Sequence, residues 1–126
     1  MGDSDPTKVQ FVYRIAPEEE WESAQDKGAY YGGKLDAEFV HLSTALQIPG
    51  TLKRFYHERN DLFLLQIDVG KLASAGNLRW EWADGQQFPH FYGPSDAFAP
   101  LPLEAVVEKT KLEVVGDQHS LPTLSS

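Results

Sequence analysis

The segment Leu62–Val69, LFLLQIDV, is the most apolar stretch of the chain and decides its fold class. A nearly continuous run of Leu and Ile over this length is typical of a β-strand that is buried on both faces. It is much shorter than the roughly 20 residues that a membrane-spanning helix needs. We therefore expect Leu62–Val69 to be the central strand of a sheet, with the other elements packed around it.

Both expected helices come before this strand. Val9–Ile15 alternates in a way that predicts a first strand. Pro17 and the three glutamates after it are typical of a helix N-terminus, and Gly28 is a candidate C-cap, so we expect a helix between them. The elements expected after this helix are a loop over 29–38, a short strand over 39–42 and a second helix over 52–59.

The elements after the central strand are mainly strands. They are expected to be a turn or short helical segment over 70–76, a strand over 78–82, an irregular proline-rich loop over 86–102 and one long or two short strands over 103–115. Two early helices followed by several strands favour an α+β fold with a small, mostly antiparallel, split sheet over a repeating βαβ sheet.

Length and composition indicate one ordinary domain. The chain has 126 residues, of which we expect 8–115 to form a single domain, 1–7 a disordered N-terminal tail and 116–126 a flexible C-terminal tail. It has no cysteine, which excludes disulfides, thiolate nucleophiles and Cys-based zinc sites. The first residues, MGDSDPTK, lack the features of a signal peptide, so we expect a cytoplasmic location.

The charge of the chain argues against polyanionic partners. Eleven Lys and Arg residues against nineteen Asp and Glu residues give a net charge of −8. General nucleic-acid binding and membrane-surface binding both draw on an excess of cationic side chains, so neither is expected. A local basic pocket for one phosphorylated small molecule stays open, and the sequence does not indicate an oligomeric state.

Several familiar motifs are absent or incomplete. Gly28–Leu35 has nearly the spacing of a phosphate-binding P-loop, but Leu35 stands where Ser or Thr would hold magnesium. The four histidines show no HxxxH spacing, so no metal site is expected. No GxSxG segment is present, which argues against a serine hydrolase of that type.

Three segments carry candidate functional residues. FVHLST (39–44) places His41 at the end of a strand, followed by Ser43 and Thr44 where the chain turns. FPHFYGP (88–94) places His90 and Tyr92 in a segment restricted by prolines. In the first strand, Arg14 has the donors to bind a phosphate through two parallel N–H groups.

Each candidate has a structural alternative. His41 also fits a core histidine bonded to the backbone, with Ser43 acting only as a helix cap. His90 also fits a hydrophobic loop that covers the sheet. Arg14 also fits an ordinary ion pair with one of the many acidic residues nearby. The residues alone leave these alternatives open.

Taken in order, these segments resemble the family catalogued as domain of unknown function 952, and the resemblance extends over nearly all of 8–115. That family is similar in turn to the ADP-ribosyltransferase fold and most of all to the tRNA 2′-phosphotransferases, whose second motif is His-Val-His-Leu-Ser. Phe39–Ser43 matches this motif, and Arg14 stands where the first motif has His. The sequence departs from the pattern at Ile15-Ala16, which replaces Gly-Thr.

The resemblance implies a compact ADP-ribosyltransferase-like fold that uses NAD or a related nucleotide. It implies that Arg14 anchors a phosphate or ribose and that His41 binds the ribose hydroxyls. The candidate carboxylate at the ribose 2′-hydroxyl is Glu81, and the candidate base for an acceptor is His90. The other implied binding residues are Ser43, Thr44, Tyr31 and Tyr92, of which the two tyrosines would flank the nicotinamide ring.

Three functions therefore stay open. The first is an NAD- or nucleotide-using transferase of the ADP-ribosyltransferase type. The second is a non-catalytic module of the same fold that binds a small molecule or serves in an interaction. The third is a hydrolase of a phosphorylated ribose in which His41 and His90 act as acid and base. The proposal as a whole requires residues 14, 41 and 90 to surround one cleft.

Overall fold

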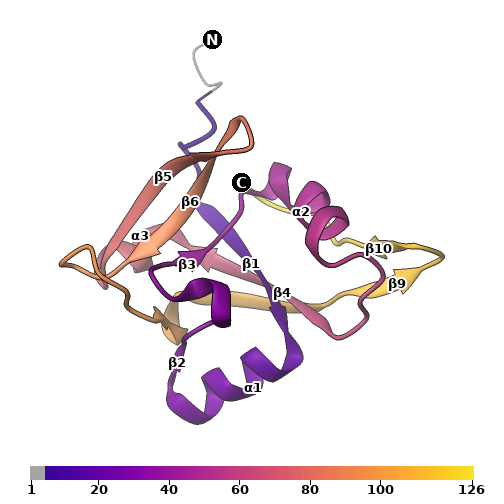
Figure 1. The fold of residues 1–126 in the computed structure, drawn as a ribbon, viewed down its shortest axis with the longest axis horizontal. Coiled ribbons are helices and arrows are strands. Elements are labelled where there is room, and N and C mark those ends of the chain that lie inside the picture. Colours follow the sequence, from indigo (N-terminus) through magenta and orange to yellow (C-terminus); the bar gives the residue numbers. More distant parts are fainter. Residues whose placement is uncertain (1–4) are drawn as a thin grey trace.

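The central strand of the molecule is β4 (Leu62–Asp68), the apolar segment quoted above. In the computed structural model, which describes residues 5–126, it lies between β1 (Phe11–Pro17) and β8 (Val106–Lys111) and runs antiparallel to both (Figure 1). Leu64 and Leu65 are both buried and belong to different apolar clusters, so both faces of the strand are covered. The prediction of a central strand is confirmed.

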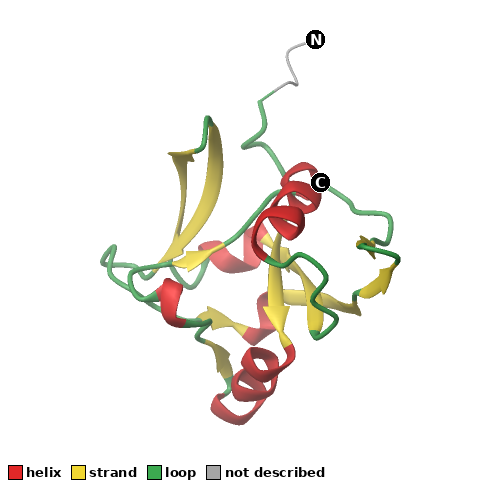
Figure 2. Cartoon of the chain, turned by 45° about the vertical axis from the view of Figure 1, so that its right-hand side comes forward, coloured by secondary structure: helices red, strands yellow, loops and turns green. Residues whose placement is uncertain are grey.

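A second three-stranded antiparallel sheet carries the two histidine segments. Its order is β3 (Val40–His41), β6 (Gln86–Tyr92) and β5 (Asn77–Ala83). β5 and β6 form a long hairpin that projects from the rest of the chain in both Figure 1 and Figure 2.

The irregular loop predicted over 86–102 is therefore wrong for its first seven residues, which form β6. The prolines of this segment suggested a loop because Pro cannot donate to a strand ladder. Pro89 lies opposite Trp80 of β5, and on its other side its carbonyl accepts from the backbone N of Leu42, just beyond β3, at 3.1 Å. The proline is tolerated because the paired strand β3 ends at this point, where a donor on residue 89 is not needed to continue the ladder.

The remaining elements connect the two sheets. The helices are α1 (Glu18–Lys27), α2 (Ile48–Phe55) and α3 (Val69–Ala73), with short 3-10 helices η1 (Lys34–Asp36), η2 (Ala45–Gln47) and η3 (Leu103–Ala105). The short strands are β2 (Ala29–Tyr30), paired with β7 (Leu101–Pro102), and β9 (Glu113–Val115), paired with β10 (Gln118–Ser120). The fold is thus α+β with antiparallel sheets, as predicted. None of the described helices has the length and apolar character to cross a membrane.

The ends of the elements follow local chemistry. Gly28 ends α1 with a left-handed φ of 80°, as expected for its C-cap. The second helix was predicted over 52–59 but begins at Ile48, because Pro49 occupies its first turn, where a missing N–H costs nothing. The side chain of Thr44 caps η2, which precedes this helix.

The C-terminal segment, expected to be a flexible tail over 116–126, makes defined contacts instead. Gln118–Ser120 pairs with β9, and Leu121 and Leu124 pack against the cluster that contains Tyr13. The Tyr13 hydroxyl donates to the carbonyl of Ser125 at 2.6 Å. The disordered tail predicted at 1–7 lies mostly outside the described residues, since these begin at residue 5.

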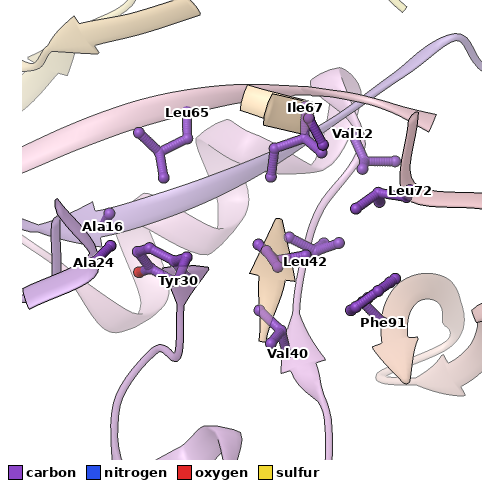
Figure 3. Close-up of a cluster of buried hydrophobic side chains, with 12 residues drawn as sticks. Val12, Ala16, Ala24, Tyr30, Val40, Leu42, Leu65, Ile67, Leu72 and Phe91 are labelled. Carbon is purple, nitrogen blue, oxygen red and sulfur yellow. The ribbon is translucent and has the colours of Figure 1, made fainter. Parts of the chain in front are cut away.

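The larger apolar cluster joins the two three-stranded sheets (Figure 3). Val12 and Leu65 come from the first sheet, and Val40 and Phe91 come from the second; all four are 0% exposed. Burying apolar side chains between the sheets stabilises their relative position. Side chains on β1 are therefore held at a fixed distance from side chains on β3 and β6.

We expect Leu65→Ala to lower the free energy of unfolding by about 2–5 kcal/mol, because it leaves a cavity in the apolar cluster of the central strand. Urea unfolding followed by tryptophan fluorescence measures this change. Leu46→Ala is the matched control, because Leu46 is 89% exposed, and it should leave the unfolding free energy nearly unchanged. Equal effects of the two variants would contradict this assignment of the core.

Candidate functional site

A cleft of about 480 Å³ opens where the first sheet, η1, α2 and the β5–β6 hairpin meet. The cleft is lined among others by Arg14, Asp36, His41, Ser43, Phe55 and His90. Residues 14, 41 and 90 come from three separate segments and surround this one cleft, as the sequence analysis required.

Arg14 is 7% exposed and uses every donor of its guanidinium. Its Nε donates to the Tyr30 hydroxyl at 3.0 Å, and its two Nη atoms donate to the two oxygens of Asp36 at 2.9 and 2.8 Å. The remaining N–H groups donate to Glu20 at 3.0 Å and to the carbonyl of His41 at 2.9 Å. A guanidinium has five donors, so a ligand phosphate would have to displace one of these partners. Arg14 therefore positions other residues of the site.

Asp36 is the central acceptor of the site. Besides Arg14, its carboxylate accepts from the Gly33 backbone N at 2.7 Å and from both the backbone N and Nδ1 of His41, at 2.9 and 3.0 Å. Burial raises the pKa of Asp36, but the hydrogen bonds from His41 and Arg14 lower it by more, and it lies well below its usual range. Asp36 therefore carries a fixed negative charge next to His41.

Gly32 and Gly33 let the loop approach these carboxylates. Gly32 has a φ of +77°, and a Cβ on it would lie 2.4 Å from Oδ2 of Asp36. A Cβ on Gly33 would lie 2.5 Å from Oε2 of Glu20. Gly33, one of the two glycines that gave this loop its partial likeness to a P-loop, and the adjacent Gly32 are thus needed for close packing against two acidic side chains.

His41 is held by Asp36 and is open to the cleft. Because Asp36 is ionised, Nδ1 of His41 is the donor in their contact, and Nε2 is left for a ligand. The side chain is 46% exposed, and among residues 5–126 no hydrogen-bond partner is found for its Nε2. This arrangement fixes the ring while leaving one nitrogen free to exchange a proton.

His90, on β6, has the same arrangement with a different carboxylate. Its Nδ1 lies 2.7 Å from Oε1 of Glu81, which also accepts from the Tyr92 hydroxyl at 2.7 Å. These two hydrogen bonds lower the pKa of Glu81, so it is ionised and Nδ1 of His90 is the donor. Burial lowers the pKa of His90 below 6.5, outweighing the opposite effect of Glu81. His90 is therefore neutral at pH 7.

Glu81 and Tyr92 lie behind His90 and do not line the cleft. Burial and the hydrogen bond to Glu81 raise the pKa of Tyr92 to about 12, so it keeps its proton. The structure therefore places both residues where they orient His90 without contacting a ligand in the cleft.

The two imidazoles lie directly opposite each other. His41 is the register partner of His90 in the β3–β6 pair, and their ring centroids are 5.4 Å apart. Phe39 packs on both, with its centroid 4.6 Å from that of His41 and 4.1 Å from that of His90. Two histidines held this close can take a proton from one ligand atom and give one to another.

The other predicted binding residues differ in position. Ser43 lines the cleft, with its hydroxyl 3.4 Å from that of Thr51. Thr44 is 6% exposed and acts as the cap of η2. Tyr31 is 43% exposed and stacks on Phe98 outside the lining of the cleft. The two tyrosines expected to flank a nicotinamide ring are therefore both outside the cleft.

Sequence reasoning missed Asp36 and Phe39. Asp36 lies in a polar loop five residues before His41, so its only signal was an acidic residue shortly before a histidine at a strand end. Phe39 was read as part of a motif, and its packing against both histidines depends on the pairing of β3 with β6.

The fold and the cleft together define a small α+β protein whose antiparallel sheets meet at a cleft lined by two histidines. The model of the family described as "Protein of unknown function (DUF952)" matches residues 15–109, and the chain belongs to this family. The matched range contains His41, Glu81 and His90 and begins one residue after Arg14.

The chain is also similar to protein CC0527 from Caulobacter crescentus. The crystal structure of CC0527 is 28% identical, with a TM-score of 0.74, and the match covers 86% of this chain and 91% of that one. Its solution NMR structure is likewise 28% identical, with a TM-score of 0.70, and the match covers 86% and 90%. No curated protein matches the chain.

We expect Gly32→Ala to destabilise the protein more than Gly116→Ala. Both glycines have a positive φ, of +77° and +68°, which costs a non-glycine residue about 1–2 kcal/mol. Only at Gly32 would the new Cβ also collide with Asp36, whereas the space around Gly116 is open. Urea unfolding of both variants measures the difference, and equal losses would show that Asp36 is not packed against this loop.

We expect Asp36→Asn to lower the free energy of unfolding by about 3–5 kcal/mol at pH 7, because it removes the main partner of a buried guanidinium. The folded pKa of Asp36 is lowered, so its contribution is present above pH 3.8 and is lost as the pH falls further. The difference between wild type and variant should therefore shrink below pH 3.8 in urea unfolding.

The control for this variant is Asp96→Asn, which removes an exposed ion pair with Arg79 and should change stability little. A loss of stability as small as that of the control would show that the Arg14–Asp36 pair does not support the fold.

Proposed function

We propose that this protein is a hydrolase of a phosphorylated ribose in which His90 accepts a proton and His41 donates one. The observation that supports the proposal best is the pair of opposed imidazoles, each with Nδ1 bonded to a carboxylate. A carboxylate on Nδ1 fixes the tautomer and leaves Nε2 to act on a ligand. Because the pKa of His90 is lowered, it is the base of the pair.

A ribose 2′,3′-cyclic phosphate illustrates the chemistry that two histidines supply. His90 Nε2 takes a proton from water, and the water oxygen forms a bond to phosphorus. The bond from phosphorus to one ribose oxygen breaks, and that oxygen takes a proton from Nε2 of protonated His41. The products are a ribose monophosphate and two imidazoles whose protons re-equilibrate with solvent.

The cleft is lined by charges of both signs, and one of its cations is open to a phosphoryl group. Lys34 and Arg59 line it, as do the carboxylates of Glu20, Asp36 and Asp84. Arg59 is paired with Asp61 at 2.6 Å, whereas Lys34 forms no ion pair within the described part of the chain. Lys34 is therefore the cation available to a phosphate, in place of Arg14, whose donors are all used.

A second candidate is an NAD-using transferase of ADP-ribosyltransferase-like fold. It is favoured by the resemblance and by the contact between Arg14 and the backbone of His41. Nicotinamide leaves NAD as a neutral molecule and needs no proton, so this reaction would use only one of the two histidines. Two further observations argue against the transferase. Every donor of Arg14 is already used, and Tyr31 and Tyr92 lie outside the cleft.

We expect wild-type protein to hydrolyse a nucleoside 2′,3′-cyclic phosphate, and His41→Ala and His90→Ala each to lower kcat by about 10²–10⁴-fold. His57→Ala is the matched control, because His57 is exposed and outside this cleft, and it should retain full activity. The acidic limb of the kcat/KM profile should have an apparent pKa below 6.5, because the base must be deprotonated.

The same variants are assayed with NAD for release of nicotinamide. The alternative result is that the protein releases nicotinamide from NAD in a reaction that needs His41 but no proton donor, and leaves the cyclic phosphate intact. That result would replace the proposed hydrolysis by the transferase reaction. Absence of both activities, with a thermal shift on adding nucleotide, would indicate the non-catalytic binding module.

A further inference from the structure

The cleft has a polar floor and an apolar mouth. Arg14, Asp36 and the two opposed histidines form the floor, whereas Leu35 and Phe55 line the cleft closer to solvent. Leu35 is 83% exposed and Phe55 is 60% exposed. Large apolar side chains exposed together beside a polar site are typical of a surface that a ligand or partner covers.

The exposure of Phe55 follows from its place on α2. Ile48, Leu52 and Phe55 are spaced by four and three residues, so they share one face of the helix. The first two are 0% and 3% exposed in the core, but Phe55 ends the helix beyond the core, at the cleft. Its position is therefore fixed by a buried helix face, while Phe55 itself stays 60% exposed.

The neighbours of Phe55 hold its ring at the mouth. The guanidinium carbon of Arg54 lies 5.1 Å from the ring centroid, and Arg54 also forms an ion pair with Asp84 in the turn of the β5–β6 hairpin. The side chain of Gln47 donates to the carbonyl of Gln87 at 2.8 Å, which again joins the hairpin to the segment before α2. The mouth is thus built from elements tied to one another.

The exposure of Leu35 follows from the burial of the next residue, Asp36. Asp36 is 3% exposed and bonded to Arg14, so the preceding residue of η1 faces solvent at the edge of the cleft. An exposed leucine beside a buried aspartate gives the cleft an apolar edge directly next to its polar floor.

We infer that Leu35 and Phe55 form a subsite for the planar heteroaromatic group of a nucleotide whose phosphorylated ribose reaches the histidines. Aromatic side chains stack on nucleobases, and a cleft of about 480 Å³ is in the range that holds a small ligand of this size. A sugar phosphate without a base has no apolar surface to cover these two side chains. The inference rests on the proposed function for the reacting group, but its evidence is the apolar mouth alone.

The test compares two substrates that differ only in the base: adenosine 2′,3′-cyclic phosphate and methyl riboside 2′,3′-cyclic phosphate. We expect Phe55→Ala to raise KM for the adenosine substrate about tenfold, with kcat nearly unchanged, because stacking binds ground state and transition state alike. KM for the methyl riboside should not change. Phe55→Trp should restore the wild-type KM for the adenosine substrate.

Leu46→Ala is the control for loss of an exposed apolar side chain, because Leu46 is 89% exposed and does not line the cleft. It should leave both KM values unchanged. Equal wild-type KM values for the two substrates would overturn the subsite. An equal effect of Phe55→Ala on the two KM values would also overturn it.

A binding measurement separates this inference from the proposed function. AMP is titrated calorimetrically into wild type, into Phe55→Ala and into the His41→Ala/His90→Ala double variant. Binding that is weakened by Phe55→Ala, in a protein that turns over neither substrate, would sustain the subsite while the proposed hydrolysis fails. Turnover of the substrates that Phe55→Ala leaves unchanged would support the proposed hydrolysis and overturn the subsite. Self-association that Phe55→Ala abolishes, without AMP binding, would assign the mouth to a second copy of the chain and overturn the subsite.

Discussion

The hydrogen bonds of Arg14 are the interaction on which the site depends. One buried guanidinium contacts α1 through Glu20, β2 through Tyr30, η1 through Asp36 and β3 through the carbonyl of His41. A buried charge is tolerated only when its partners satisfy it, and these partners come from the four elements that follow β1 in the chain, 6 to 27 residues from Arg14. The same contacts that satisfy Arg14 therefore bring those elements to one place.

Asp36 connects the hydrogen bonds of Arg14 to the cleft. Hydrogen bonds from His41 and the charge of Arg14 keep the pKa of Asp36 low, and its carboxylate in turn holds the backbone and the ring of His41. His90 is oriented separately, by Glu81 from the neighbouring strand. The two imidazoles are thus placed by independent carboxylates in different surroundings, an arrangement on which the proposed division into base and acid depends.

The parts of the fold that the sequence predicted are those governed by local pattern. The apolar run of β4 and the Pro17–Gly28 limits of α1 depend on residues close in sequence, and both were predicted. β6 was missed because Pro89 and the prolines that follow the strand suggest a loop unless its pairing with β5 is known. Asp36 was missed for a similar reason: its partners are Arg14, 22 residues away, and a strand whose position depends on the core. His41 was found as an imidazole at a predicted strand end and His90 as an imidazole between two prolines and several aromatic residues, and neither signal requires knowledge of the strand pairing.

The alternation of β1 has a consequence for how this protein tolerates changes in chain length. Tyr13 points into one apolar cluster, and the next residue, Arg14, points to the opposite side of the sheet, into the site. Because neighbouring residues of a strand face opposite ways, the loss or gain of one residue before Arg14 would exchange these two faces. A charge would then enter the apolar cluster and an aromatic ring would replace the guanidinium. A substitution on this strand leaves the orientation of the neighbouring residues unchanged, whereas a single-residue deletion there would reverse it and remove the anchoring of both sheets at once.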